Sequence, residues 1–478
     1  MPPTLALSGC ALFVFWLFAK DSRRRGKISA ALWIPLTWAF IISSKPVSVW
    51  LGMGSGLLDD GGAPQDQLID KAIFLGLIAA GLFVLSRRRL DWRATVRNNK
   101  WLFVYFLYLG LSVLWSGESF VSLKRWIKDF GNVVMVLVIL SEENPDEAIK
   151  AFFSRCAYLV VPLSVLVIRY YPQSSRHYDM WTNQPWFVGI NTDKNAFGMA
   201  VFVCALSLFR TLLEFWERRR RDKARAELIG YTVLMMMAAW LLHMAQSATA
   251  ITCTVLGSGI ILSMKVPAVK KKVHQLGAYI ATIAVTFMLI KVSGFDKFVV
   301  GQVAGLVGRD PSLHGRDAIW GLVLNEDINP LIGEGFYSFW SAERNARLSK
   351  NYYYPLGEAH NGYIEIYLNE GLIGVALLIT VMGSSIRGIK RDILGGVDLG
   401  ALRLAFLCTV AIYNVTESVF DRLGLMWFAF VLVLMEYPRV ANAASSCSTT
   451  PQLQGTDAIL TGRLDRGSAD VPSSASAC

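Results

Sequence analysis

Charged residues are scarce in this chain. Asp, Glu, Lys and Arg make up 17% of its 478 residues, and hydrophobic residues make up 54%, whereas soluble proteins usually carry roughly 25% charge. This deficit excludes a soluble enzyme and a disordered protein. The apolar residues form recurring runs such as 28–44, 101–116, 277–291 and 371–384. Each run is close to the ~20 residues that a helix needs to cross a bilayer, so the sequence indicates a polytopic membrane protein.

Metal and cofactor signatures are also missing. Five of the seven cysteines stand singly inside apolar runs, and there is no Cys-x-x-Cys pair or Cys/His cluster. A disulfide framework and a zinc site are therefore not supported. The sequence has no Walker, dinucleotide-binding or zinc-protease motif. We expect neither a metal nor a cofactor.

The positive charge of the chain is concentrated between the apolar runs. The net charge is +11, with basic clusters at 20–27, 87–100, 218–225 and 265–272. Basic loops stay on the cytoplasmic side of a membrane. We therefore interpret these clusters as an orientation signal, and we expect no nucleic-acid partner.

The alternation of apolar runs and basic loops predicts an all-α membrane protein of about 12–13 transmembrane helices. Helices are expected because the runs are too long for the strands of a membrane barrel. The order of the basic loops places the N-terminus outside and the C-terminus in the cytoplasm. The expected spans are 3–19, 28–44, 70–86, 101–116, 126–140, 151–169, 196–214, 229–245, 248–264, 277–292, 369–386, 401–417 and 424–437.

The spans divide the chain into four regions. Residues 1–292 form a transmembrane helical region, 293–368 a large outward loop, and 369–437 the C-terminal transmembrane helices. Residues 438–478 are rich in Ser, Ala, Thr and Gly without apolar periodicity, which predicts a disordered cytoplasmic tail. The outward loop is long enough to form a small structured cap, and we expect it to carry the functional site.

Local patterns predict three features in the outward loop. Arg316 and Trp320 are one helical turn apart, which favours a short amphipathic helix over 317–325 lying on the membrane. Gly333 and Gly335 indicate a tight turn. Asn361 stands before an apolar helical run and is a natural N-cap.

His360 is the candidate catalytic residue of this loop. A helix N-terminus favours the neutral imidazole, and a neutral imidazole at a membrane boundary suits a general base for a sugar hydroxyl. The alternative is a histidine that only hydrogen-bonds the loop. Arg316 and Arg347 allow the same two interpretations, since an arginine can clamp phosphates or form loop salt bridges.

Residues spread from about 30 to 420 form a recognisable pattern. Its parts are Gly315-Arg316-x-x-x-Trp320, Gly333-x-Gly335, His360-Asn361 followed after nine residues by Gly371-x-x-Gly374, Leu114-Trp-Ser116 with Ser122 and Arg125, Gly189–Asn195, and Asn414-Val-Thr-Glu417-Ser. The pattern resembles the membrane family of O-antigen ligases and O-antigen polymerases. The stretches 31–38 and 44–50 resemble its exopolysaccharide-production branch.

This resemblance implies a glycosyltransferase of the all-helical, GT-C-like type that uses lipid-linked sugars. Members transfer a glycan from undecaprenyl pyrophosphate to an acceptor hydroxyl on the periplasmic side, with inversion and without metal or nucleotide. The resemblance makes His360 the base and Arg316 a pyrophosphate ligand. Asn361 and Glu417 are further candidate contacts for the substrate, and the carboxylates of Glu358 and Glu365 are candidate orienters of the imidazole.

The chain departs from the ligases at one position. Ligases place an arginine after a serine at the start of a mid-chain span, where this chain has Gln246-Ser247-Ala248-Thr249. Lys194, Arg176 or Arg347 would have to replace that arginine in the phosphate clamp. The missing charge favours a polymerase over a ligase.

Three functions remain open from the sequence. The first is a polymerase that joins lipid-linked repeat units into exopolysaccharide or O-antigen, with a flippase and a chain-length regulator as possible partners. The second is a ligase that transfers glycan to lipid A core or to protein. The third, from a different class, is a flippase or transporter of lipid-linked sugars. All three place the chain in the bacterial inner membrane, with lipid around it and the outward loop in the periplasm.

Overall fold

The computed structural model describes residues 2–25, 28–53, 67–178, 183–218, 222–275, 277, 316–351 and 356–437. The expected span 277–292, apart from residue 277, and the tail 438–478 lie outside the described residues, as do His314 and Gly315. The main helices of the described part are α1 (Pro3–Arg24), α2 (Trp33–Ile42), α4 (Leu68–Arg87), α5 (Trp92–Asn98), α6 (Lys100–Ser112), α7 (Ser119–Leu140), α8 (Pro145–Tyr170), α10 (Lys194–Arg218), α11 (Asp222–Met244), α12 (Ala248–Ser263), α13 (Pro267–Lys271), α16 (Arg316–Leu324), α17 (Ala342–Leu348), α18 (Gly362–Leu394), α19 (Asp398–Tyr413) and α20 (Leu425–Leu434). One short antiparallel hairpin, β1 (Arg176–Tyr178) and β2 (Pro185–Phe187), precedes α10.

The described part is an all-α polytopic membrane protein, as the sequence predicts. Six of its helices are long and apolar enough to cross a bilayer, and the bent pair 248–263 with 267–275 would make a seventh. Shorter apolar helices cover 30–42, 100–115 and 425–434. Because several expected spans are short helices here, the count of 12–13 stays a prediction.

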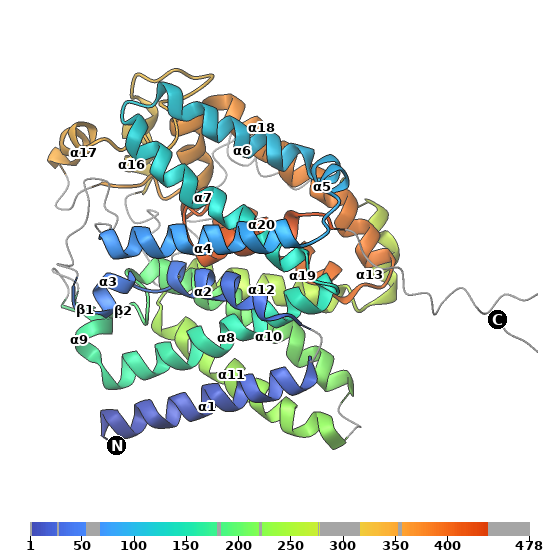
Figure 1. The fold of residues 1–478 in the computed structure, drawn as a ribbon. Coiled ribbons are helices and arrows are strands. Elements are labelled where there is room, and N and C mark those ends of the chain that lie inside the picture. Colours follow the sequence, from blue (N-terminus) through green and yellow to red (C-terminus); the bar gives the residue numbers. More distant parts are fainter. Residues whose placement is uncertain are drawn as a thin grey trace, which may run out of the picture. The chain divides into compact units, whose positions relative to one another are not determined.

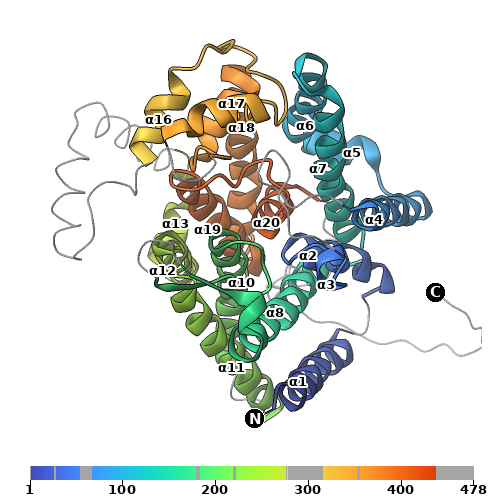
Figure 2. The same cartoon turned by 90° about the vertical axis from the view of Figure 1, so that its left-hand side faces the viewer.

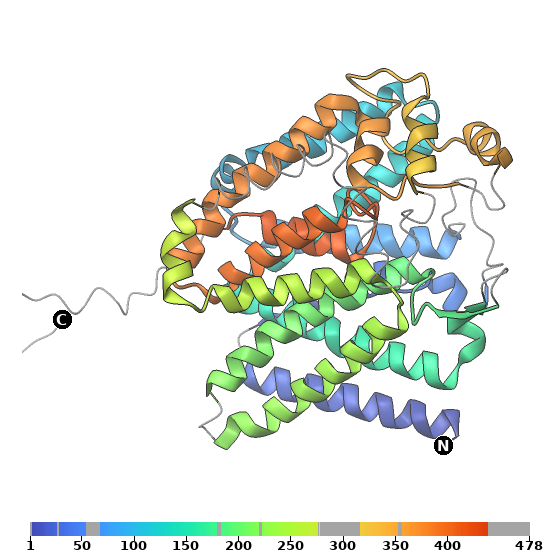
Figure 3. The same cartoon turned by 180° about the vertical axis from the view of Figure 1, so that it is seen from behind.

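The two ends of the helical bundle carry different segments. Figure 1 shows the β1–β2 hairpin and α17 at one end, with α5 and α13 at the other, and Figure 3 shows the same separation from behind. The basic clusters at 87–100 and 265–272 belong to the α5 and α13 end. This arrangement agrees with the separation of basic loops from the outward loop that the sequence predicts.

The core of the bundle lies around α20, in which every residue is buried. A chain of three polar contacts links this helix through α7 to α2. Trp427 of α20 donates from Nε1 to Asp129 of α7 at 2.8 Å, and Asn132 donates to the same carboxylate at 2.9 Å. Trp38 of α2 donates to Asn132 at 2.8 Å. Because lipid offers no hydrogen bonds, this chain of contacts fixes the three helices relative to one another.

Helix α18 is broken at Gly371, where φ is +65° and ψ is −167°. A segment of the outward loop fills the break. Gly335 N donates to Asn369 O at 2.7 Å, and Leu372 N donates to Pro330 O at 2.9 Å. The expected turn at Gly333 and Gly335, both at positive φ, therefore serves to bring loop backbone against the opened helix. This docking holds the outward loop on the membrane helices and positions the site described next.

Candidate functional site

His360 lies in the tight connection that leads into α18. Its φ is +49°, a left-handed conformation that histidine adopts more readily than most residues. Asn361 follows as the N-cap, and its Oδ1 accepts from Tyr363 N at 3.0 Å and Ile364 N at 3.1 Å. The predicted N-cap is thus confirmed. Asn361 N also donates to Ser418 Oγ at 3.1 Å, which ties the connection to the segment after α19.

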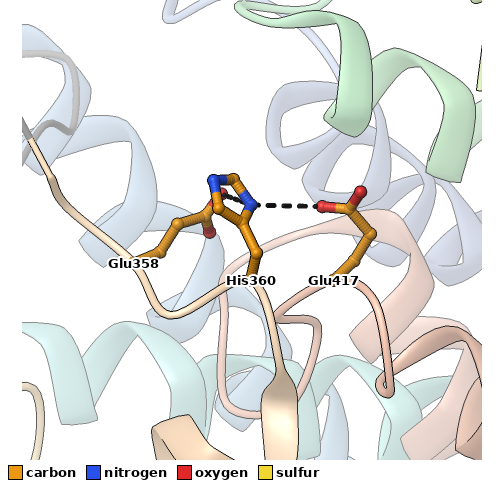
Figure 4. Close-up of side chains that lie close together, drawn as sticks. All are labelled: Glu358, His360 and Glu417. Carbon is orange, nitrogen blue, oxygen red and sulfur yellow. Dashed lines mark ion pairs between the residues drawn. The ribbon is translucent and has the colours of Figure 1, made fainter. Parts of the chain in front are cut away.

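Two carboxylates flank the imidazole of His360 (Figure 4). Nδ1 lies 2.8 Å from Oε1 of Glu358 and 3.5 Å from Oε2 of Glu417. The His360 and Glu358 side chains are each about a quarter exposed, at 26% and 25%, whereas Glu417 is 4% exposed. One side of the imidazole is therefore held by charge contacts while part of the ring remains open to a substrate.

Two arginines complete the cluster. Arg316, the first residue of α16, donates to Oε1 of Glu417 at 2.7 Å. Arg422, in the connection between α19 and α20, contacts Glu358 at 2.8 Å and Glu365 at 3.2 Å. Asn195, near the start of α10, donates to Glu417 at 3.1 Å. Segments far apart in the sequence thus converge in one cluster of three acidic and three basic side chains. Its members are Glu358, Glu365, Glu417, Arg316, His360 and Arg422.

Hydrogen bonds of Ala359, the residue between Glu358 and His360, fix the loop backbone. Its N–H donates to Oε2 of Glu365 at 2.9 Å, and its carbonyl accepts from Trp320 Nε1 at 2.8 Å. The expected amphipathic helix is present as α16, with Ile319 and Val323 buried. Both sides of the Ala359 peptide are therefore anchored, one by α16 and one by α18.

The electrostatics of the cluster correct one expectation from the sequence. Burial alone lowers the pKa of the His360 imidazole, but the contacts and charges of Glu358 and Glu417 outweigh burial and raise that pKa to about 9. The prediction of a neutral imidazole is therefore wrong for the free protein at neutral pH. A helix N-terminus acts as about half a charge, whereas two whole negative charges lie within 3.5 Å of Nδ1.

Glu358 shows the opposite shift. Burial raises the pKa of its carboxyl group, but the charge of Arg422, the contact with His360 and the charge of Arg316 together lower that pKa to about 2. Glu358 is therefore ionised wherever His360 titrates. It is an anchor for the imidazole rather than a proton donor.

The same three side chains bear on the question of a metal. One ligand atom from each of Glu358, His360 and Glu417 lies within 4.8 Å of the other two. Arg422 and Arg316 already contact the two carboxylates, and they supply the positive charge that a cation would bring. We interpret the cluster as an ion-pair network, and the absence of a metal requirement stays a prediction.

The other predicted phosphate ligands occupy different surroundings. Lys194 is exposed at the first residue of α10, next to Asn195. Arg176 lies on the β1–β2 hairpin, 5.4 Å from the ring of Phe187. Arg347 of α17 pairs with Glu326, with one contact of 3.0 Å. Phosphate binding by these three residues stays a prediction, as does substrate contact by Asn361.

Sequence reasoning did not select Arg422, which belongs to the cluster, or Asn195, which donates to Glu417 of the cluster. The signal for Arg422 was the charged pair Asp421-Arg422 between two apolar runs. Asn195 had a weaker signal, as the last residue of a polar stretch before a span. Neither signal identified Glu358 and Glu417 as the partners, because those contacts join segments separated by 64 and 222 residues.

Comparison with known proteins gives one similarity. The chain is 25% identical over 316 residues to the exopolysaccharide production protein ExoQ of Rhizobium meliloti (strain 1021). The match covers 63% of this chain and 68% of that protein. It supports an O-antigen ligase or polymerase-like membrane family. No protein-family model matches the chain.

Proposed function

We propose that this chain is a membrane glycosyltransferase that polymerises lipid-linked repeat units into an exopolysaccharide or O-antigen. The carrier would be undecaprenyl pyrophosphate, and the reaction would take place on the periplasmic face of the inner membrane. The observation that carries the proposal is the imidazole of His360, which Glu358 contacts at Nδ1 beside Arg316 and Arg422. The similarity to a protein named for exopolysaccharide production supports the product class.

The chemistry assigned to His360 is general-base catalysis. The acceptor hydroxyl oxygen forms a bond to the anomeric carbon, and its proton passes to Nε2 of the neutral imidazole. The bond from the anomeric carbon to the pyrophosphate oxygen breaks on the opposite face, and the leaving group keeps the electron pair. This geometry inverts the anomeric centre. Glu358 holds Nδ1 and stabilises the imidazolium that forms.

Arg316 is the proposed ligand for the pyrophosphate. A guanidinium presents a planar fork that matches two phosphate oxygens, and in the free protein Arg316 contacts Glu417 at 2.7 Å. An incoming diphosphate therefore competes with Glu417 for Arg316. Its negative charge replaces that of a carboxylate, so the positive charge of Arg316 stays balanced.

A transporter of lipid-linked sugars is the second candidate, and the break in α18 is the observation that favours it. Transporters often bind substrates at discontinuous helices near the membrane midplane. Here the opened backbone at Gly371 pairs with the loop around Pro330 and Gly335, which leaves those groups occupied. We therefore propose the glycosyltransferase as the first candidate function and the transporter as the second.

The test is a complementation assay with His360→Ala in a strain that lacks the chromosomal gene. Loss of a general base costs roughly 10²–10⁴ in rate, so we expect normal insertion and little polymer. Single repeat units on the lipid carrier should accumulate on the periplasmic face. His274→Ala, on the segment after α13 at the opposite end of the bundle, is the matched control and should make normal polymer.

Each other outcome has a definite meaning. If His360→Ala makes polymer at the wild-type rate, His360 is not the general base, and the mechanism is overturned. Carrier-linked units that accumulate on the cytoplasmic face would indicate a transporter. Finished polymer that remains on the carrier would indicate a ligase.

A further inference from the structure

Three buried carboxyl groups lie close together among the helices, apart from the ion pairs around His360. They belong to Asp129 of α7, Glu370 of α18 and Asp421 in the connection between α19 and α20, and these residues are 2%, 2% and 4% exposed. Each carboxyl group lies within electrostatic range of the other two. Helix α6 packs on α18 and α7 packs on α20, and Figure 2 shows α6 and α7 on one side of α18 and α20. The packing of these helices gathers three acids in one buried place, which we name the acid triad.

Each member of the acid triad has one buried oxygen that accepts no hydrogen bond in the described structure. These oxygens are Oδ2 of Asp129, Oε2 of Glu370 and Oδ1 of Asp421. The other oxygen of Asp129 accepts from Trp427 at 2.8 Å, and that of Asp421 accepts from the hydroxyl of Tyr105. Among the described residues, no donor reaches the carboxyl group of Glu370. A buried ionised carboxylate without donors is strongly disfavoured, so the surroundings of Glu370 favour the neutral acid.

The arginine next to the acid triad does not compensate its charge. Arg422 follows Asp421 in the chain, but it contacts Glu358 at 2.8 Å and Glu365 at 3.2 Å. Glu365 adds a further negative charge within range of Glu370. Within the described ranges, no ion pair joins a member of the acid triad to a cation.

The cations of α7 near Asp129 contact aromatic rings. Arg125 lies 5.1 Å from the ring of Tyr337, and Lys128 lies 5.2 Å from the ring of Phe74. The other titratable neighbours are phenols, which are neutral near pH 7. They belong to α6 and to the outward loop and are Tyr105, Tyr108 and Tyr337. Negative charge therefore dominates around the acid triad.

Asp421 lies outside the membrane-spanning helices and shows the effect of these surroundings. Burial and the negative charge of Asp129 raise the pKa of the Asp421 carboxyl group well above its usual range, and the hydrogen bond from Tyr105 lowers that pKa by less. Asp421 therefore keeps its proton at a pH where an ordinary carboxyl group has lost it.

Glu370 lies at the break in α18, where the outward loop docks. The carbonyl of the preceding residue, Asn369, accepts from Gly335 N at 2.7 Å, and its Oδ1 accepts from Phe339 N at 3.1 Å. The carbonyl of Glu370 itself accepts from the hydroxyl of Tyr108 at 2.7 Å. A charge on the Glu370 side chain would thus arise within one residue of the backbone that holds the loop.

We infer that the acid triad is a proton-binding centre, in which protons on Glu370 and Asp421 hold the outward loop docked on α18. When these protons pass to water, they leave like charges together beside Asp129, where little solvent screens them. The repulsion pushes α18 away from α7 and from the α19–α20 connection, so the loop loses its support at Asn369. The centre is independent of the proposed transfer reaction, because none of the three carboxyl groups contacts His360 in the described structure.

The first test is infrared spectroscopy of the full-length protein in detergent at neutral pH. A protonated carboxyl group has a C=O stretch that a carboxylate lacks. We expect this band in the wild type and a weaker band in both Glu370→Gln and Asp421→Asn. Asp129→Asn should keep the band but lose it at a lower pH, because removal of the negative charge lowers the pKa of Asp421.

Asp70→Asn is the matched control for the infrared test. Asp70, in the first turn of α4, is also buried at 3% exposed. Its two oxygens accept from N and Oγ of Ser48, at 3.1 and 2.5 Å, so this variant should leave the band unchanged. Absence of the band in the wild type, an undiminished band in Glu370→Gln and Asp421→Asn, or equal weakening in Asp70→Asn would overturn the proton-binding centre.

The second test measures docking of the loop by amide hydrogen exchange of residues 329–340 at increasing pH. Protection factors, which correct for the pH dependence of free amides, should fall in the wild type by about tenfold per pH unit for each proton lost. The double variant Glu370→Gln with Asp421→Asn cannot ionise at these positions and should keep its protection. Exchange detects the loss while the docked loop is still the major form, so the readout does not need transfer activity. Equal loss of protection in the wild type and the double variant, or constant protection in the wild type, would overturn the coupling to the loop.

Discussion

The Nδ1 atom of His360 lies 2.8 Å from Oε1 of Glu358. The contact fixes the ring so that Nε2 is the nitrogen left for a substrate, and it stabilises the protonated imidazole. The same contact therefore both orients the candidate base and limits the fraction of it that is free of a proton at neutral pH.

The pH dependence of transfer should follow from this pair. Because a general base acts in its neutral form and the pKa of His360 is about 9, the rate at low substrate concentration should rise with pH, reach half its maximum near pH 9 and level off above that. Initial rates with a lipid-linked repeat unit across pH 6–10 measure this profile. A profile that is flat from pH 6 upward would show that His360 does not donate or accept the limiting proton.

Glu358→Gln should move that profile to lower pH. Removing the negative charge takes away the main stabilisation of the imidazolium, so the pKa of His360 should fall toward its usual value near 6.5. The transfer rate should fall as well, because the amide holds the ring less firmly. Imidazole NMR titration reports the pKa even if the transfer assay fails. An unchanged pKa in Glu358→Gln would contradict the assigned contact.

The stability of the protein should also depend on pH, because the same pair of residues is formed only in the folded state. Folding raises the pKa of His360 from about 6.5 in the unfolded chain to about 9. The contribution of this pair to the free energy of unfolding is therefore fully present below pH 6.5 and is lost as the pH rises through about 9. We expect on the order of 2 kcal/mol from this pair. The melting temperatures of the wild type and His360→Ala should therefore differ at pH 6 and converge above pH 9. A difference that stays constant with pH would indicate a packing effect.

Arg316→Lys should lose most transfer activity although it keeps the charge. Lysine is a point charge and cannot form the two parallel contacts of a guanidinium. Arg391→Lys is the matched control, since Arg391 is an exposed arginine that pairs with Glu436 at the far end of α18, and this variant should retain activity. Complementation with both variants at equal expression gives the comparison. Full activity in Arg316→Lys, or an equal loss in both variants, would contradict the role assigned to Arg316.

Gly371→Ala should destabilise the fold. The backbone conformation at this position is one that only glycine adopts without strain, at a cost of about 1–3 kcal/mol for other residues. A Cβ there would also lie 2.3 Å from the carbonyl of Leu331. Gly383→Ala in the same helix meets nothing within 4 Å and should leave the melting temperature unchanged or higher. Equal melting temperatures for the two variants would show that the break is not held as described.

The sequence predicts the fold class well because lipid imposes a simple rule on composition and length. Apolar runs and basic loops are local properties, and α1, α4, α8, α10 and α11 follow them closely. The N-cap at Asn361 and the helix at α16 are also local patterns, and both are confirmed.

The candidate site depends on contacts that no local pattern contains. The sequence selects His360, Arg316 and Glu417 separately, but their juxtaposition requires α16 and the α19–α20 connection to meet in space. The raised pKa of His360 follows from that juxtaposition. The sequence alone predicts a lowered pKa and a neutral imidazole, which is wrong. The role of Arg422 as the partner of Glu358 is likewise visible only once α18 and α20 are placed.

The break in α18 also bears on how the protein is made. The residues that occupy it, around Pro330 and Gly335, leave the ribosome before Gly371 does. The backbone groups that pair with the opened helix are therefore already synthesised when α18 enters the bilayer. They lie only about forty residues earlier in the chain, so the loop between them is short. A deletion in that short segment would leave polar backbone groups facing hydrocarbon. Its first effect should be failed membrane insertion and proteolysis of the nascent chain, before any enzymatic defect is seen.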